Sequence, residues 1–262
     1  MLRLAIIGGG RMGEALLGGL LAAGWATPSE IAVVEALPAR REELAARFPG
    51  VAVVDAPVAA EGVVIAVKPG DVATATAAAA DAGARRLLSI AAGVTLARLQ
   101  DAAGSRVAVV RAMPNTPALV GAGAAAIAGG AGAGAADLDW AESILAAVGT
   151  VVRVPESLLD AVTGLSGSGP AYVFLVAEAL IEAGVLVGLP RDAAHALAVQ
   201  TLLGAATLLA ESDEGPEALR AAVTSPGGTT AAGLRALEAA GVRAAFTDAV
   251  VAATQRSREL GA

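Results

Sequence analysis

Three glycines near the start of the chain have the spacing of a dinucleotide-binding turn. Gly8, Gly10 and Gly13 spell G-x-G-x-x-G after the apolar residues 4–7. The first glycine of such a turn permits a tight bend, the second lets the backbone approach a pyrophosphate, and the third lets helix and strand pack closely. The N–H groups that open the following helix favour phosphate. The spacing therefore predicts strand, turn and helix around a dinucleotide.

An acidic residue follows the second strand-like run. Residues 31–34 are apolar and Glu35 comes next, about where an acidic side chain would bind a ribose hydroxyl. Glu35 favours NADH, because its carboxylate binds the ribose diol and repels a 2′-phosphate. Arg40 and Arg41, just beyond, could instead receive that phosphate. The sequence therefore leaves the choice between NADPH and NADH open.

The chain holds a single lysine, Lys68, among its 18 Lys and Arg residues. Lys68 follows the apolar residues 63–67 and precedes Pro69. Open α/β sheets bind ligands where their strands end. We interpret Lys68 as a binding residue, and a surface lysine without a role is the alternative.

Acid and base groups are scarce in the second half, which holds one histidine, one tyrosine and no lysine. His195 lies in the middle of a helical pattern and is more typical of an interface or surface position than of a catalyst. Glu178 and Glu182 lie four residues apart on one helix face, where a solvated or partner-facing stripe is the favoured interpretation. With no metal ligand nearby, we predict no metal site.

Two glycine-rich segments of the second half suit an anionic substrate. Residues 164–172 read as a flexible turn that leads into a helix. In residues 224–234, the N–H groups of Gly228, Thr229 and Thr230 precede or open another helix, which predicts a carboxylate site without an arginine. Ordinary capped helix starts are the alternative for both segments.

The elements that must position these residues alternate between strand and helix up to about Pro155, which predicts an α/β fold with a mainly parallel sheet. The predicted strands are residues 4–7, 31–34, 51–54, 63–67, 87–91, 107–111 and 151–154, with a small strand and loop within 122–136. The predicted helices of this half include 39–47, 71–82 and 138–148. After Pro155 only helical patterns remain: 171–187, 192–209, 216–223, 230–239 and 243–259.

This change of pattern predicts two domains. Residues 1–155 form an N-terminal Rossmann-type dinucleotide-binding domain, and residues 156–262 form a C-terminal all-helical domain. The helix from Tyr172 to Val187 is apolar around most of its circumference, and such a helix must be buried. About a hundred residues offer it little to pack against, so we expect two chains to interlock here.

Composition limits the other function classes. Hydrophobic residues make up 56% of the chain, but many are alanine, and the charge-free stretch 119–136 is mostly Gly and Ala, so we expect no membrane span and no signal peptide. The absence of cysteine excludes disulfides and thiolate chemistry and suits a cytoplasmic location. A net charge of -7 and 2% aromatic residues argue against nucleic acid as a partner.

Four further motifs resemble the pyrroline-5-carboxylate reductase family over essentially the whole chain. They are Ala66-Val67-Lys68-Pro69, Met113-Pro114-Asn115-Thr116-Pro117, Leu165-Ser166-Gly167-Ser168-Gly169-Pro170-Ala171-Tyr172, and Val223-Thr224-Ser225-Pro226-Gly227-Gly228-Thr229-Thr230. The resemblance implies reduction of 1-pyrroline-5-carboxylate to L-proline with NADPH or NADH, in proline biosynthesis. It also implies homodimers that pair through the C-terminal helices and can assemble into decamers.

The resemblance assigns residues to each ligand. The cofactor-binding residues would be Ile7, Gly8, Gly9, Gly10, Arg11, Met12, Gly13, Glu35, Ala66, Val67, Lys68, Pro69, Ile90, Ala91 and Ala92. The substrate-binding residues would be Ser225, Gly227, Gly228, Thr229 and Thr230. The substrate is a cyclic imine whose protonated form already carries the nitrogen proton, so hydride transfer needs no strong acid. Thr230 matches the family threonine that orients that nitrogen.

Two positions depart from the family pattern. Ala222 replaces an asparagine that some relatives place eight residues before the threonine, and Asp55 stands where many members have asparagine near the adenosine. Two other functions stay open: a hydroxyacid or ketoacid dehydrogenase of the same two-domain build, and a non-catalytic NAD(P) sensor. Such dehydrogenases use a lysine in the helical domain, which this chain lacks.

Overall fold

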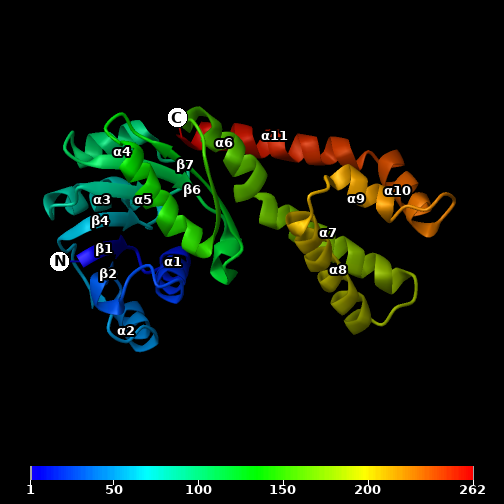
Figure 1. Ribbon diagram of the computed structural model, residues 1–262, viewed down its shortest axis with the longest axis horizontal. Coiled ribbons are helices and arrows are strands. Elements are labelled where there is room, and N and C mark those ends of the chain that lie inside the picture. Colours follow the sequence, from blue (N-terminus) through cyan, green and yellow to red (C-terminus); the bar gives the residue numbers. More distant parts are fainter. Residues whose placement is uncertain (1, 262) are drawn as a thin grey trace. The chain divides into compact units, whose positions relative to one another are not determined.

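A sheet forms the centre of the first part of the chain (Figure 1). The computed structural model describes residues 2–261. Its strands are β1 (Leu2–Ile7), β2 (Ile31–Val34), β3 (Ala52–Val54), β4 (Ala60–Ile65), β5 (Arg86–Ser89), β6 (Ala108–Met113), β7 (Gly123–Gly129) and β8 (Gly149–Arg153). The order is β3-β2-β1-β4-β5-β6-β7-β8, and all neighbours are parallel except β6 and β7. The direction of winding changes between β1 and β4, where doubly wound sheets bind ligands.

Helices connect the strands and make up the second part of the chain. The α-helices are α1 (Arg11–Ala22), α2 (Pro38–Arg47), α3 (Val72–Asp81), α4 (Leu96–Ala103), α5 (Ala135–Leu145), α6 (Leu159–Val162), α7 (Gly169–Leu186), α8 (Arg191–Glu211), α9 (Pro216–Ala222), α10 (Thr229–Ala239) and α11 (Val242–Gly261). Short 3-10 turns occupy Pro28–Glu30, Pro69–Asp71, Thr116–Val120, Ala146–Val148 and Glu156–Leu158, and Thr163–Gly167 is a π turn.

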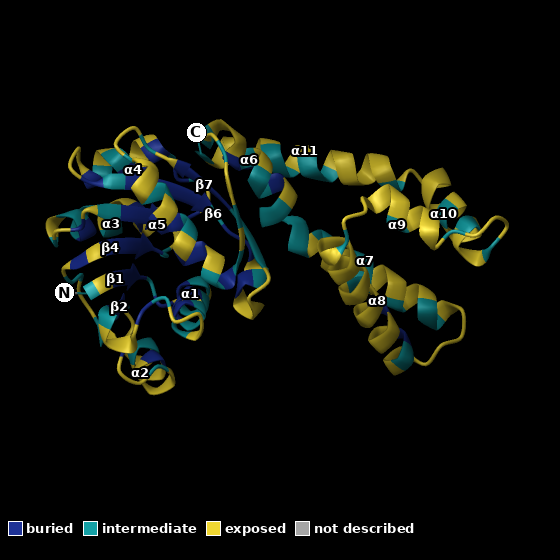
Figure 2. Cartoon of the chain, viewed as in Figure 1, coloured by how far each residue is buried: buried dark blue, intermediate teal, exposed yellow. Residues whose placement is uncertain are grey.

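Two apolar clusters cover the two faces of the sheet. Helices α1, α2 and α5 pack on one face through residues such as Leu16 and Ile144. Helices α3, α4 and α6 pack on the other through residues such as Leu99 and Leu159. The central strands send alternate side chains into both clusters, so they are buried on both sides, as the dark blue strands of Figure 2 show. The predicted α/β fold, with a Rossmann-type first part and a helical second part, is confirmed.

The chain divides into two compact units. One runs up to Ser168 and takes in the chain from Val251 onward, and the other is Gly169–Val250. The first unit thus extends beyond the expected boundary at residue 155. It does so because Leu159 of α6 is fully buried against the sheet and Ser257 of α11 donates to Asp160 Oδ1 at 2.7 Å.

Most predicted elements are present with shifted ends. The small strand expected within residues 122–136 is β7, whereas the strand expected at 63–67 ends at Ile65. Helix α4 lies between β5 and β6, where the alternation of strand and helix predicts a helix without giving its bounds. It spans only eight residues, is capped by the Thr95 hydroxyl and buries Leu96 and Leu99 on one face.

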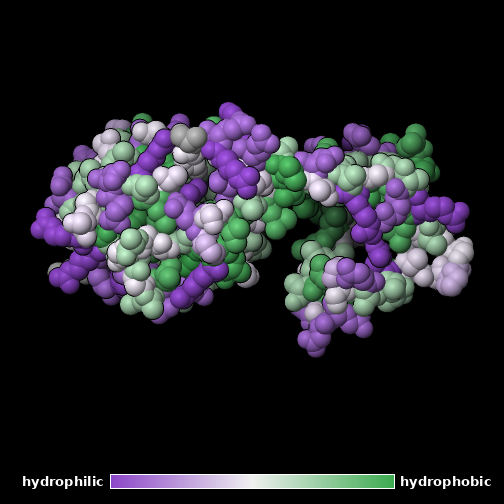
Figure 3. Space-filling view, turned by 90° about the horizontal axis from the view of Figure 1, so that it is seen from above, coloured by the Kyte–Doolittle hydropathy of each residue, from purple (hydrophilic) through white to green (hydrophobic). Residues whose placement is uncertain are grey.

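The second unit exposes much of its apolar surface. Large apolar side chains of α7 and α8 lie in solvent, among them Phe174 at 63% and Leu175 at 65% exposure. Most of both helices carries the colour of exposed residues in Figure 2. In the space-filling view, hydrophobic residues in green reach the surface of this unit (Figure 3). Two helical segments, Glu156–Leu186 and Arg191–Glu211, are long and apolar enough to span a membrane by length and composition alone.

Candidate active site

The register of the sheet aligns the turns that carry the predicted cofactor-binding residues. Ile7 of β1 pairs with Val34 of β2 and with Ile65 of β4, and Ile65 pairs with Ser89 of β5. Four neighbouring parallel strands therefore end at one level. The residues that follow these ends, Gly8, Glu35, Ala66 and Ile90, begin a row of turns along one edge of the sheet, at the change of winding.

The glycine turn has the geometry that the motif predicts. Gly8 has φ +109°, and a Cβ there would lie 2.5 Å from the carbonyl oxygen of Ala66. A Cβ on Gly13 would lie 2.0 Å from the carbonyl oxygen of Gly8, so only glycine lets α1 pack this close. Above Gly10 there is open space, with no atom within 4 Å of a Cβ position. The backbone can therefore be approached by a phosphate at Gly10.

Helix α1 presents free N–H groups at this open side. Its first hydrogen bond runs from the N–H of Glu14 to the carbonyl of Gly10, at 2.9 Å. The N–H groups of Arg11, Met12 and Gly13 therefore precede the helical ladder and are available to an anion. These residues fit the pyrophosphate of a dinucleotide.

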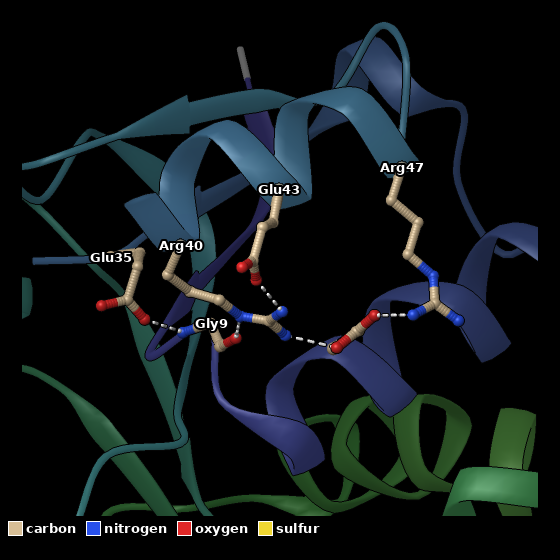
Figure 4. A network of polar contacts seen from close by, with 6 residues as sticks. Gly9, Glu35, Arg40, Glu43 and Arg47 are labelled. Carbon is tan, nitrogen blue, oxygen red and sulfur yellow. Dashed lines mark hydrogen bonds and ion pairs between the residues drawn. The ribbon is translucent and has the colours of Figure 1, made fainter. Parts of the chain in front are cut away.

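Glu35 and Arg40 contact Gly9 of the glycine turn (Figure 4). The carboxylate of Glu35 accepts the N–H of Gly9 at 3.0 Å and that of Leu37 at 2.9 Å. Arg40 donates to the carbonyl of Gly9 at 2.8 Å, and Arg41 donates to the carbonyls of Glu35 and Ala36. Both arginines expected to be open to a 2′-phosphate thus have partners within the protein.

Lys68 and its neighbours form the turn after β4. Ala66 and Val67 are half-buried, while Lys68 and Pro69 are exposed and lead into a 3-10 turn. After β5, Ile90 is half-buried, Ala91 is buried and Ala92 is exposed.

A cavity of about 550 Å³ opens beside these two turns. Its lining residues are Pro69, Gly70, Ala92, Gly93, Val94, Arg98, Thr163, Ser168, Ala253, Arg256, Ser257 and Leu260, all within the first unit. Two residues of the predicted cofactor site, Pro69 and Ala92, therefore border a cavity large enough for a small ring system.

The structure corrects the flexible turn predicted at residues 164–172. The helical path continues from Glu156 through the π turn Thr163–Gly167 into α7. A π turn releases backbone groups from the usual ladder, and the carbonyl of Ser166 accepts the side-chain N–H of Asn115 at 2.9 Å. The same amide accepts the N–H of Ala124 at 2.9 Å. Asn115 thus joins three segments, a structural role that its place between two prolines did not reveal.

The predicted substrate loop is tight and exposed in the single chain. Gly227 has φ +72°, and the N–H of Gly228 donates to the carbonyl of Ser225 at 3.0 Å. The N–H of Gly228 was predicted to be free, so this is a correction. The first bond of α10 runs from Ala232 to the carbonyl of Gly228, which leaves the N–H groups of Thr229, Thr230 and Ala231 ahead of the ladder. The N-cap residue of α10 is Gly228.

Other candidate groups lie elsewhere. His195 is exposed on α8, and Glu178 and Glu182 are exposed on α7. Within residues 2–261, no group of three or more histidine or acidic residues is placed to hold a metal ion.

Comparison with known proteins assigns both halves of the chain. Residues 156–260 match the family described as pyrroline-5-carboxylate reductase dimerisation, and residues 3–93 match NADP oxidoreductase, coenzyme F420-dependent. The pyrroline-5-carboxylate reductase of Synechocystis is 49% identical over 99% of this chain and 98% of its own length.

Solved structures agree with these matches. A pyrroline-5-carboxylate reductase from Coxiella burnetii superposes with a TM-score of 0.94 and 36% identity, over 100% of this chain and 99% of that one. The Plasmodium falciparum pyrroline carboxylate reductase with NADP bound gives a TM-score of 0.86 and 29% identity, over 100% of this chain and 98% of that one. The chain belongs to the pyrroline-5-carboxylate reductase family.

Proposed function

We propose that this protein reduces 1-pyrroline-5-carboxylate to L-proline with NADPH or NADH, in proline biosynthesis. The observation that carries the proposal is the row of turns after β1, β2, β4 and β5, built on the glycine turn, in a chain that also holds the anion-binding start of α10. The reductase relatives and the NADP-bound Plasmodium structure support it. The cofactor residues are those predicted from Ile7 to Gly13, at Glu35, from Ala66 to Pro69 and from Ile90 to Ala92.

The chain's own part in the reaction is binding and orientation. When bound, NAD(P)H supplies the hydride. The N–H groups of Arg11 and Met12 would hold the pyrophosphate, and the turns at Ala66 and Ile90 would position the nicotinamide. Because the protonated imine already carries its nitrogen proton, the protein needs no strong acid, in agreement with the scarcity of such groups.

The substrate is assigned to the loop from Ser225 to Thr230. The N–H groups of Thr229 and Thr230 at the start of α10 suit the carboxylate, and Ser225, Gly227 and Gly228 shape the loop around it. The hydroxyl of Thr230 orients the imine nitrogen. We assign residues 1–155 to dinucleotide binding and residues 156–262 to dimerisation and substrate binding.

The C-terminal helices form the interface between chains. It matches a dimerisation family, and its exposed apolar side chains need a cover. We infer that the residues from Tyr172 to Val187 are buried between two chains, and that dimers can assemble into decamers. A protein partner for these helices accounts for their apolar character without a membrane. We further propose a cytoplasmic location and no nucleic-acid partner, given the net charge of -7.

An assay with several substrates tests the function. The purified chain is expected to oxidise NADPH or NADH with 1-pyrroline-5-carboxylate and to be inert with 2-keto acids. Reduction of keto acids but not of the imine would identify a hydroxyacid or ketoacid dehydrogenase instead. Binding of the dinucleotide without turnover of any substrate would identify an NAD(P) sensor.

A further inference from the structure

Gly9 lies in the glycine turn but is not one of the three glycines of the motif. Both its N–H and its carbonyl nevertheless form hydrogen bonds with side chains (Figure 4). Its N–H donates to Glu35 Oε2 at 3.0 Å, and its carbonyl accepts from Arg40 Nε at 2.8 Å. A Cβ at this position would lie 2.4 Å from Leu44 Cδ1, on the buried side of α2. The end of β2 and the helix α2 therefore fix this part of the turn.

Arg40 is held in turn by two carboxylates. Its Nη1 donates to Glu43 at 2.9 Å, and its Nη2 pairs with Glu14 of α1. Glu14 also lies 2.5 Å from Arg47 Nη1. All three nitrogens of the Arg40 guanidinium thus have an acceptor, and the group is directed at α1 and the glycine turn (Figure 4).

We propose that Arg40 is a positioning residue of the phosphate-binding turn and does not recognise the 2′-substituent of the cofactor ribose. The inference rests on the proposed function, since it concerns how the chain holds its dinucleotide. By fixing the Gly9 carbonyl, Arg40 sets the direction of the peptide groups that follow at Gly10 and Arg11. Both NADH and NADPH place a pyrophosphate there, so the contribution of Arg40 is common to the two cofactors.

Arg40, together with Arg47, neutralises the carboxylate of Glu14. The Glu14 side chain is 15% exposed and lies in the first turn of α1, close to where the negative phosphates would bind. Without Arg40, only the exposed Arg47 would offset this carboxylate, which would then repel the pyrophosphate of either cofactor more strongly. This second effect again makes no distinction between NADH and NADPH.

The test is the affinity of Arg40→Met for each cofactor. NADH and NADPH are titrated separately into the purified full-length protein without imine, by calorimetry. Both dissociation constants are expected to rise by the same factor, on the order of tenfold, with their ratio kept within about twofold. A loss confined to NADPH would show that Arg40 binds the 2′-phosphate, and unchanged affinity for both would show that Arg40 does not position the turn. Either result overturns the inference.

Two further variants sharpen the result. Arg40→Lys keeps a positive charge but cannot reach Gly9 and both carboxylates together, so both affinities are expected to fall by a common, smaller factor. If Arg40 bound the 2′-phosphate, the affinity for NADPH would instead be kept in Arg40→Lys. The same variant tests the inference if Arg40→Met fails to fold. Glu43→Gln removes an exposed partner of Arg40 and leaves the contacts to Gly9 and Glu14, so it is the control and should leave both affinities unchanged.

The kinetic readout separates positioning from a general loss of structure. In Arg40→Met, the KM for both cofactors is expected to rise while kcat at saturating cofactor is kept, and the melting temperature of the nucleotide-free protein is recorded beside it. The wild-type chain is measured first with imine and each cofactor. Failure of the proposed function would appear in the wild type, whereas failure of this inference would appear only in the variants.

Discussion

At the scale of single residues, the substrate loop depends on the first positions of α10. Gly228 caps the helix, so Thr229 and Thr230 are its first two residues and both offer N–H groups ahead of the ladder. Neither threonine hydroxyl is needed as the helix cap. Their hydroxyls are therefore available for contacts outside the helix, and the two positions can be tested separately.

Thr230→Ala is expected to lower turnover and to leave dinucleotide affinity nearly unchanged. The loss of one hydrogen bond, about 1 to 3 kcal/mol, corresponds to a fall of roughly fivefold to a hundredfold in kcat. Steady-state kinetics at saturating substrate checks it. Thr229→Ala is the control and should reduce stability or substrate affinity more than turnover. Full turnover in Thr230→Ala together with its loss in Thr230→Ser would rule out the hydroxyl and direct attention to Ser168 or bound water.

Glu35→Ser is expected to raise the preference for NADPH over NADH. Removal of one charge that repels the 2′-phosphate, about 1.4 to 2.8 kcal/mol, shifts the ratio of kcat/KM by up to about tenfold to a hundredfold. Because Glu35 also accepts the N–H groups of Gly9 and Leu37, affinity for both cofactors should fall as well. An unchanged ratio would place Glu35 away from the ribose.

At the scale of elements, one carboxylate joins the helix α4 to the sheet. Glu156 Oε1 accepts the N–H of Leu96 at 2.7 Å, in the first turn of α4, and it pairs with Arg111 of β6 at 2.9 Å. Arg111 is buried, at 6% exposure. The turn after β5 leads directly into α4, so this ion pair also supports the cofactor-side turn at Ile90.

Glu156→Ala is expected to lower the free energy of unfolding, because it leaves the guanidinium of Arg111 buried without its partner. Removing one member of a fully buried pair costs about 3 to 5 kcal/mol. The Glu156 side chain is 34% exposed, so solvent screening reduces the expected loss to about 2 kcal/mol. Urea denaturation measures it. Arg153→Met, which removes more exposed ion pairs with Asp139 and Glu142, is the control and should change stability by less than about 0.5 kcal/mol. Equal losses in the two variants would contradict the assignment.

At the scale of the whole molecule, the single chain leaves its second unit without a sufficient core. Within residues 169–250 only Ala194 and Ala198 are buried apolar residues, whereas large apolar side chains of α7 and α8 are exposed. A stable interface covers such surface with a second copy. The small number of buried apolar residues and the match to a dimerisation family both lead us to expect a dimer.

The protein is expected to be at least a dimer at micromolar concentration. Leu175→Glu, which places a charge on the apolar surface of α7, should weaken assembly and lower activity. Light scattering coupled to size-exclusion chromatography measures the molecular mass of both forms. Asp81→Asn, an exposed change at the end of α3 in the first unit, is the control and should leave the mass unchanged. A monodisperse wild-type monomer would contradict both the interface and any active site shared between chains.

The sequence by itself determined the fold class and the strand ends that most of the predicted cofactor-binding residues follow. Strand and helix periodicities and the glycine spacing are local, so residues 4–13 could be interpreted without the rest of the chain. The register then placed Glu35, Ala66 and Ile90 at aligned strand ends, as parallel pairing requires. The excess of apolar residues in the second half likewise predicted that the C-terminal helices form an interface with a second chain.

Only the tertiary structure decided which polar groups are already engaged. Arg40 and Arg41 read as free cations in the sequence, but the fold brings the carbonyls of Gly9 and Glu35 to them. The carbonyl of Ser166 in the π turn accepts the side-chain N–H of Asn115, which lies far away along the chain. Such contacts join segments many residues apart, so no local pattern encodes them. Whether a polar side chain is free to bind a ligand therefore depends on its neighbours in space. Sequence periodicity and motif spacing do not predict those neighbours.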